Sequence, residues 1–270
     1  MGSIETVVSG DGTPVAYERD GEGPPLVLVH GTTADRLTWE FVLPELQKHF
    51  TTYAVDRRGR GESGNDDGNG YRMEREFEDV VAVIESTGET VSLLGHSYGA
   101  ICALEGALRS GRVRGLVLYE GTFPVPAGTE LYPPDALDGI RSSLNSGDRE
   151  EALTTFYRDI ALIPSEDIEM LRSLPVWPAR VALAPTIPHE MRTFERYVHN
   201  FDPGRVGSLR TPTLLMVGGN SPSLEKAAAA DLNSVLLDSR IVVMSHQAHL
   251  AHRTAPELFV REVVRFLRRA

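Results

Sequence analysis

The chain is poor in cysteine and lysine and has no long apolar run. Its single cysteine, Cys102, cannot form an intramolecular disulfide, so the fold does not depend on an oxidising compartment. No stretch reaches the roughly 18 consecutive apolar residues of a membrane span. Residues 1–25 also lack the apolar core of a signal peptide. We therefore expect a cytoplasmic protein that does not bind membranes.

Basic residues are outnumbered by acidic ones. The chain has 27 Lys and Arg residues against 38 Asp and Glu residues, a formal net charge of −11, and only Lys48 and Lys226 are lysines. This charge repels nucleic-acid phosphates and anionic lipids, which favours a small-molecule partner. With 41% hydrophobic residues the 270-residue chain is typical of globular proteins with a large core, not of disordered ones. Nothing identifies an interface, so a monomer and a homodimer both remain open.

Short apolar runs alternate with segments of helical spacing over the first 120 residues. The runs are continuous and rich in β-branched residues, which is typical of parallel strands buried on both faces. They are preceded by two alternating segments around a Gly-Asp-Gly turn, which predict a hairpin. We expect hairpin strands at 4–8 and 14–19, further strands at 26–30, 52–56, 91–95 and 113–119, and helices at 38–49, 72–86 and 98–109.

This alternation stops at Glu120 and resumes near residue 211. The intervening segment, residues 121–210, is rich in proline and charge, and the last part, 211–270, restores the strand–helix pattern. The sequence therefore predicts one α/β core, residues 1–120 and 211–270, with a mostly parallel sheet of about eight strands flanked by helices. Residues 121–210 form a helical cap over the C-terminal strand ends, where open α/β sheets bind ligands. We expect amphipathic helices near 135–146, 149–161, 165–174 and 190–201, strands at 213–217 and 241–244, and helices near 224–236 and 255–268.

The pentapeptide Gly95-His96-Ser97-Tyr98-Gly99 fits the pattern G-x-S-x-G. It follows the expected strand 91–94 and opens a small-residue helix over 100–108, which is the context of a turn that presents a nucleophilic serine. Small residues flank the serine because its backbone is strained and the helix packs closely on the strand. The sequence therefore predicts Ser97 as a nucleophile.

With this motif the sequence resembles the α/β-hydrolase family over nearly its whole length. His30-Gly31-Thr32 is similar to the family's HG-x loop after the first parallel strand, and residues 56–63 are similar to its D-x-R-G-x-G-x-S segment, whose role is structural. The resemblance implies an oxyanion hole formed by the backbone N–H groups of Thr32 and Tyr98, with Thr33 as an alternative to Thr32.

Three histidines follow one another late in the chain. His246, His249 and His252 are three residues apart, a spacing that spreads their side chains around a helix, and no cysteine or carboxylate lies close by. We therefore expect no metal site, and we expect no cofactor.

The resemblance implies that one of these histidines is a base. The family pattern is a strand, a loop with Gly-His and a helix that ends in Phe-Leu. Residues 241–244, Ala248-His249 and Phe266-Leu267 match it, with alanine in place of the glycine. This match implies His249 as the base, with His246 as the alternative.

The acid departs from the commonest family pattern. The family usually has G-x-x-D after its seventh strand, but here the turn at 218–221 ends in Ser221, which cannot carry the negative charge that stabilises an imidazolium. A minority of relatives place the acid one strand earlier, where Glu120 ends an apolar run. A buried carboxylate is costly unless it has a partner, so we expect Glu120 to be the acid. Asp231 or Asp238, or no functional acid, remain alternatives.

A serine nucleophile with a histidine base implies acyl transfer. We expect an esterase or lactonase that acts on a small, fairly apolar acyl substrate, with Trp39, Phe123 and Trp177 as candidate substrate-binding residues. A C–C bond hydrolase, thioesterase, lyase or amidase would use the same three residues. A non-catalytic ligand-binding protein on the same scaffold is the alternative of another class.

Overall fold

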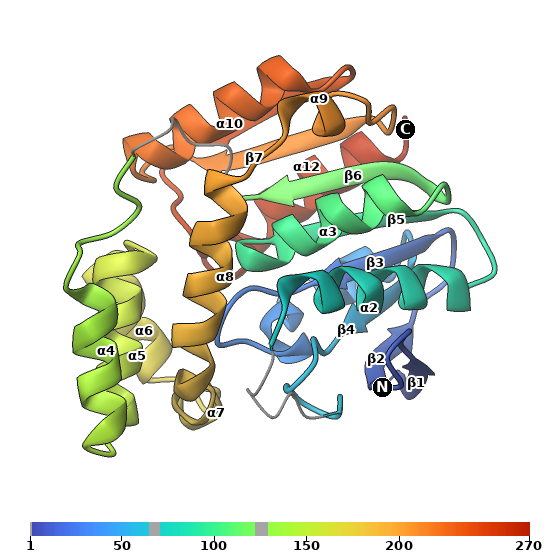
Figure 1. Cartoon of the computed structure of the whole chain (residues 1–270). Helices are drawn as coiled ribbons and strands as arrows, with labels where there is room; N and C mark the ends of the chain where they lie inside the picture. Colours follow the sequence, from blue (N-terminus) through green and yellow to red (C-terminus); the bar gives the residue numbers. More distant parts are fainter. Residues whose placement is uncertain (1, 65–70, 122–128) are drawn as a thin grey trace.

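The strands form one mixed sheet. The computed structural model describes residues 2–64, 71–121 and 129–270, and within them eight strands are ordered β1-β2-β4-β3-β5-β6-β7-β8 (Figure 1). The pairs β1–β2 and β2–β4 are antiparallel and all other neighbours are parallel, which confirms the expected hairpin and mostly parallel sheet. The strands are β1 (Ser3–Val8), β2 (Pro14–Asp20), β3 (Pro25–Val29), β4 (Thr51–Val55), β5 (Val91–His96), β6 (Val113–Tyr119), β7 (Thr213–Gly218) and β8 (Ser239–Met244).

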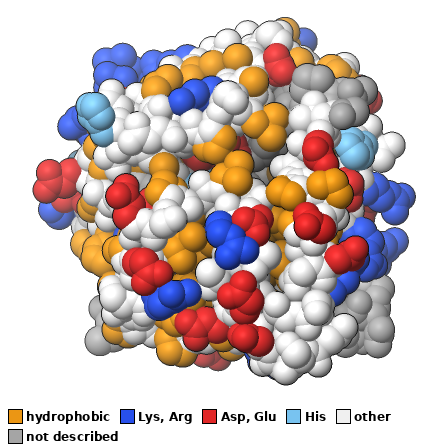
Figure 2. Space-filling view, turned by 90° about the vertical axis from the view of Figure 1, so that its left-hand side faces the viewer, with side chains coloured by type: hydrophobic (Ala, Val, Ile, Leu, Met, Phe, Trp, Pro, Cys, Tyr) orange, Lys and Arg blue, Asp and Glu red, His pale blue; other side chains and the backbone are white. Residues whose placement is uncertain are grey.

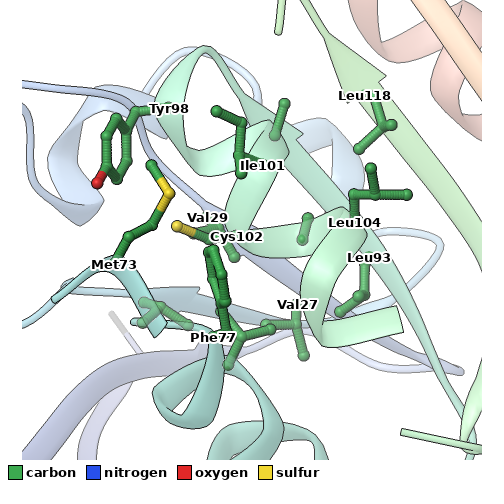
Figure 3. Close-up of a cluster of buried hydrophobic side chains, with 14 of the residues drawn as sticks. Val27, Val29, Met73, Phe77, Leu93, Tyr98, Ile101, Cys102, Leu104 and Leu118 are labelled. Atoms are coloured by element: carbon green, nitrogen blue, oxygen red, sulfur yellow. The ribbon is translucent and has the colours of Figure 1, made fainter. Parts of the chain in front are cut away.

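Helices cover both faces of the sheet, and Figure 1 shows α2, α3 and α10 on one face and α12 on the other. Successive residues of β3 therefore alternate between two hydrophobic cores. Val27 and Val29 belong to the core under α2 and α3, and Leu26 and Leu28 to the core under α12. Figure 3 shows Phe77 and Cys102 in the first of these cores together with Val27 and Val29. These helices are α2 (Met73–Ser86), α3 (Tyr98–Arg109), α10 (Ser223–Val235), α11 (Ala251–Thr254) and α12 (Pro256–Leu267).

The first expected helix is interrupted. In place of one helix over 38–49, the structure has a 3₁₀ turn, η1 (Arg36–Trp39), and a four-residue helix, α1 (Leu43–Leu46). Pro44 lies in the first turn of α1, where its missing N–H is tolerated. In the interior of a longer helix, the proline would remove a backbone hydrogen bond and its ring would clash with the preceding turn. The prediction of a continuous helix was therefore wrong.

A helical insertion separates β6 from β7. It lies at the end of the sheet toward which the arrow of β6 points, and Figure 2 views this side, where acidic and basic side chains are interspersed with hydrophobic ones. Four of its helices match the expected amphipathic segments, whereas α7 and α9 had not been expected. The described elements are α4 (Ala136–Asn145), α5 (Arg149–Thr155), η2 (Phe156–Ile160), α6 (Ser165–Arg172), α7 (Trp177–Ala182), η3 (Ala184–Thr186), α8 (Ile187–His199) and α9 (Pro203–Val206).

Buried ion pairs attach the insertion to the sheet. Arg57, just after β4, donates to Glu76 of α2 and to Glu190 of α8, each at 2.6 Å. Arg60 also pairs with Glu190, and all four side chains are buried. Two positive and two negative charges balance within this cluster, which is what a buried ionic group requires. Residues 57 and 60 thus act structurally, by holding α8 over the ends of the strands.

The packing of α3 on β3 leaves no space for a side chain at Gly99. A Cβ atom there would lie 2.3 Å from the Val29 carbonyl oxygen and 2.4 Å from that of His30. We expect Gly99→Ala to lower the free energy of unfolding by about 3 kcal/mol, because rigid backbone must move.

The matched control is Gly139→Ala in α4, where an added Cβ meets no atom within 4 Å. We expect it to stabilise the protein by about 0.5–1 kcal/mol through helix propensity. Urea unfolding of both variants tests the pair, and equal stabilities would contradict the packing argument.

Candidate active site

Ser97 lies at a strained turn between β5 and α3. Its φ of 54° and ψ of −125° are unusual for a residue with a side chain. Glycines make this turn possible, because a Cβ at Gly31 would lie 2.9 Å from the Ser97 Cβ, and one at Gly95 would lie 2.4 Å from the Gly99 carbonyl oxygen. The turn therefore presents Ser97 at the amino-terminal end of α3, at the edge of the sheet that the insertion covers.

The structure brings His249 to Glu120. His249 Nδ1 lies 3.0 Å from Glu120 Oε2, and the other carboxylate oxygen, Oε1, accepts hydrogen bonds from the Gly218 N–H at 2.6 Å and from the Ser221 hydroxyl. Ser221, which stands where the commonest family pattern has aspartate, thus donates to the carboxylate that replaces it. Sequence reasoning gave Ser221 no such role.

Burial and pairing act in opposite directions on these two groups. Burial by itself would lower the pKa of His249, but the hydrogen bond and the charge of Glu120 outweigh it and raise the pKa above the usual value. Burial by itself would raise the pKa of Glu120, but His249, Ser221 and the Gly218 N–H hold it below the usual range. Both shifts favour a carboxylate beside a histidine that readily accepts a proton.

Two buried side chains fasten the loop that carries His249. His96 Nε2 lies 3.0 Å from the His249 carbonyl oxygen. The Tyr119 hydroxyl donates to the Ala248 carbonyl and accepts from the Ala251 N–H at 2.9 Å. The backbone on both sides of His249 is thereby held against β5 and β6.

Two adjoining cavities lie beside Ser97 in the described part of the chain. Both are lined by Ser97, His249 and Thr32. The first, of about 20 Å³, includes Arg180 and is named here the Arg180 cavity. The second, of about 60 Å³, includes Phe194 and is named the Phe194 cavity. Both combine residues of the sheet edge with residues of the insertion.

Thr32 and Tyr98, the two residues expected to form an oxyanion hole, both line a cavity beside Ser97. Thr32 lines both cavities, and Tyr98, which lines the Phe194 cavity, is the first residue of α3, where a backbone N–H has no acceptor within the helix. His30 positions the loop before Thr32: its Nε2 accepts from the Arg57 N–H at 3.1 Å, and its Nδ1 lies 2.8 Å from the Gly31 carbonyl oxygen. Burial lowers the pKa of His30 well below its usual value, so the ring is neutral.

Two of the three expected substrate-binding aromatics lie away from these cavities. Trp39 is fully buried against His252 on the α12 side of the sheet, with ring centroids 5.4 Å apart. Trp177 packs beside Tyr157 in the insertion, and its indole N–H donates to Glu150. Neither tryptophan lines a cavity beside Ser97, because each side chain is packed in a hydrophobic core. Phe123 lies outside the described residues.

The other candidates from the sequence do not line the two cavities beside Ser97. Asp231 and Asp238 are exposed, and His246 is exposed on a turn after β8. Thr33 has a φ of 54° and its hydroxyl donates to the Thr32 carbonyl at 2.7 Å. Over the ranges 2–64, 71–121 and 129–270, no cluster of histidine, cysteine and acidic residues is suited to hold a metal ion. No helix in these ranges is both long and apolar enough to cross a membrane.

Several cavity residues from the insertion had not been identified in the sequence. They are apolar or aromatic and come from η2, the segment that follows it and α8, so the apolar faces of the expected amphipathic segments at 149–161 and 190–201 were the available signal for most of them. Periodicity indicates such a face but does not say whether it meets the core or a cavity. These residues are Phe156, Tyr157, Ile160, Ala161, Ile163 and Met191.

The fold and this arrangement define an α/β hydrolase with a serine at the strand–helix turn. Residues 26–262 match the model of the "Alpha/beta hydrolase family", and the chain belongs to this family. It is similar to N-formylmaleamate deformylase of Pseudomonas putida, with 29% identity over 90% of this chain and 88% of that protein.

Solved structures give the same result. An α/β hydrolase from Sphaerobacter thermophilus is 33% identical, with a TM-score of 0.84 over 97% of this chain and all of that one. An esterase from Rhodococcus sp. is 25% identical, with a TM-score of 0.74 over 98% of each chain.

The contact between His249 and Glu120 predicts a measurable protonation equilibrium. We expect an NMR titration of the His249 ring to give a pKa above the usual 6.5. In Glu120→Gln the charge that stabilises the imidazolium is lost while burial remains, so the pKa falls below that value. Asp231→Asn, which removes an exposed carboxylate, serves as the control and leaves the titration unchanged. An unaltered His249 pKa in Glu120→Gln would rule out this pairing.

Proposed function

We propose that the protein is a serine hydrolase that cleaves a small carboxylic ester or lactone through an acyl-enzyme. Ser97 is the nucleophile, His249 the general base and Glu120 the acid that orients and stabilises the histidine. One observation carries the proposal: Ser97 lines the same cavities as His249, whose Nδ1 is bonded to Glu120.

The proposed reaction proceeds in two half-reactions. The Ser97 Oγ attacks the substrate carbonyl carbon as His249 Nε2 takes its proton, and the N–H groups of Thr32 and Tyr98 stabilise the oxyanion. His249 then gives the proton to the leaving alkoxide, which departs and leaves an ester on Ser97. Water, deprotonated by His249, attacks this ester; the bond between the acyl carbon and the Ser97 Oγ breaks, His249 returns the proton to Oγ, and the acid product departs. These steps need no cofactor.

The insertion, residues 121–210, acts in this proposal as a cap that limits the size of the substrate. At about 20 and 60 Å³, the two cavities leave room only for small groups beside Ser97. Phe156, Met191 and Phe194 supply an apolar wall. A wall so close to Ser97 favours substrates with a short acyl or alkyl group over substrates with a long chain.

Amide cleavage is the second candidate. It is favoured by the similarity to N-formylmaleamate deformylase, which covers nine-tenths of this chain. The same three residues would serve, with His249 protonating a departing amine in place of an alkoxide. Rates measured on a matched pair of acyl ester and acyl anilide distinguish the two bond types.

Loss of the Ser97 hydroxyl should abolish the reaction. We expect wild type to hydrolyse p-nitrophenyl esters, with a preference for short chains in a series from acetate to decanoate, and Ser97→Ala to lose this activity. A fluorophosphonate should label wild type and not Ser97→Ala. Ser234→Ala, an exposed serine of α10, is the matched control and should react normally. A folded wild type that neither reacts with the fluorophosphonate nor hydrolyses any ester would favour the ligand-binding alternative.

Glu120 can be tested separately from Ser97. We expect Glu120→Gln to reduce kcat by at least about 100-fold, because the amide neither stabilises the imidazolium nor selects its tautomer. A circular dichroism spectrum and an unfolding curve show whether the variant folds. Near-normal kcat in a folded Glu120→Gln protein would exclude Glu120 as the acid.

A further inference from the structure

Arg180 is a buried cation beside the candidate nucleophile. This residue of α7 is 5% exposed and lines the Arg180 cavity together with Ser97 and His249. Its Nη1 donates to the Tyr157 hydroxyl at 3.0 Å and its Nη2 to the Thr38 hydroxyl at 3.1 Å. Its Nε has no hydrogen-bond partner among the described residues. A guanidinium carries five N–H donors, so three have no acceptor among the described residues.

The other buried arginines in the described ranges each form an ion pair. Arg180 differs, because no carboxylate within these ranges lies within 4 Å of its guanidinium nitrogens. A buried charge without an opposite partner is unfavourable, and proteins retain such groups where a ligand supplies the counter-charge. The paired arginines are Arg57 with Glu76 and Glu190, Arg58 with Asp79, Arg60 with Glu190 and Arg253 with Glu40.

The charged and titratable neighbours of Arg180 among the described residues do not compensate its charge. Burial and then the charges of Arg180 and Arg253 lower the pKa of His252 well below its usual value. Arg253 itself pairs with Glu40. The acidic residues beside Ser97, in contrast, line the other cavity: Glu120 and Glu225 belong to the wall of the Phe194 cavity. The two cavities thus differ in charge.

From this arrangement we infer that the Arg180 cavity binds a carboxylate of the substrate. The inference rests on the proposed function and narrows its substrate class to small esters or amides that carry a free carboxylate near the scissile carbonyl. A planar guanidinium matches the two oxygens of a carboxylate, and a water-excluding cavity strengthens the contact. The Thr32 hydroxyl, which has no partner among the described residues and lines the same cavity, is available as a further donor. The remaining part of the substrate occupies the Phe194 cavity.

A pair of substrates that differ only in charge tests this inference. Mono-p-nitrophenyl glutarate ends in a carboxylate, and its terminal-amide analogue is neutral and of nearly the same size. We expect Arg180→Gln to lower the ratio of their kcat/KM values, acid over amide, at least about 10-fold, the effect of losing one charged hydrogen-bond partner. Arg180→Lys should restore part of the ratio. Arg192→Gln, which removes an exposed arginine of α8, should leave the ratio unchanged. An unchanged ratio in Arg180→Gln would overturn the inference.

Binding tests the cavity without turnover. Ser97→Ala protein is titrated calorimetrically with glutarate and with glutaramide at fixed ionic strength, and the titration is repeated in the Ser97→Ala background with Arg180→Gln or Arg180→Lys. We expect glutarate to bind more tightly than glutaramide, and Arg180→Gln to raise the Kd for glutarate at least about 10-fold. Equal affinities, or no glutarate binding at millimolar concentration, would contradict the inference.

The two experiments separate failure of the subsite from failure of the proposed function. If ester hydrolysis depends on Ser97 but Arg180 does not affect the acid-to-amide ratio, the proposed hydrolase stands and the carboxylate subsite is contradicted. If glutarate binding depends on Arg180 but no hydrolysis depends on Ser97, the subsite stands and the proposed hydrolase is contradicted. Unfolding curves of the Gln and Lys variants show whether each protein folds, and the Lys variant keeps the charge where the Gln variant removes it.

Discussion

The close contact between α3 and β3 is the constraint on which the candidate site depends. Gly99 lies so near the carbonyl oxygens at the end of β3 that no side chain fits between them. This contact sets the start of α3, and the positive φ of Ser97 follows because the chain must turn sharply from β5 into that helix. The same contact puts the Thr32 loop beside Ser97. A looser packing of helix on strand would separate Ser97 from the Thr32 loop.

The sheet order explains how a carboxylate at the end of β6 can reach the histidine that a carboxylate after β7 commonly contacts. The two strands are neighbours, so their carboxyl ends lie side by side and both can reach the loop that carries His249. Glu120 extends from the end of β6 and is held by the N–H of Gly218, the last residue of β7, and by the hydroxyl of Ser221 in the turn that follows. The segment that commonly supplies the carboxylate here supplies hydrogen bonds to it. A carboxylate therefore contacts His249 although it comes from the neighbouring strand.

Buried arginines have two different roles in this molecule. Arg57 and Arg60 are neutralised by Glu76 and Glu190 and join the insertion to the sheet. Arg180 lies in the insertion, lines a cavity beside Ser97 and has no such neutralising partner among the described residues. Neutralised clusters can hold a fold together at little electrostatic cost, whereas an uncompensated cation is a binding group. The insertion is thus attached by one set of charges and, in our inference, selects substrates with another.

The sequence by itself determined the features that depend on residues close together along the chain. Continuous apolar runs indicated the parallel strands because both sheet faces are covered, and the pattern Gly95 to Gly99 indicated the turn because its glycines are a local steric requirement. The contact between Glu120 and His249 was expected from the resemblance to relatives with the acid one strand earlier, but only the tertiary structure decided that Ser221 supports it. The tertiary structure also decided that Trp39 and Trp177 fill cores and that Arg180 faces the cavity. Such outcomes depend on how segments far apart in the sequence pack together. The periodicity of a segment indicates an apolar face but not which distant surface that face will contact.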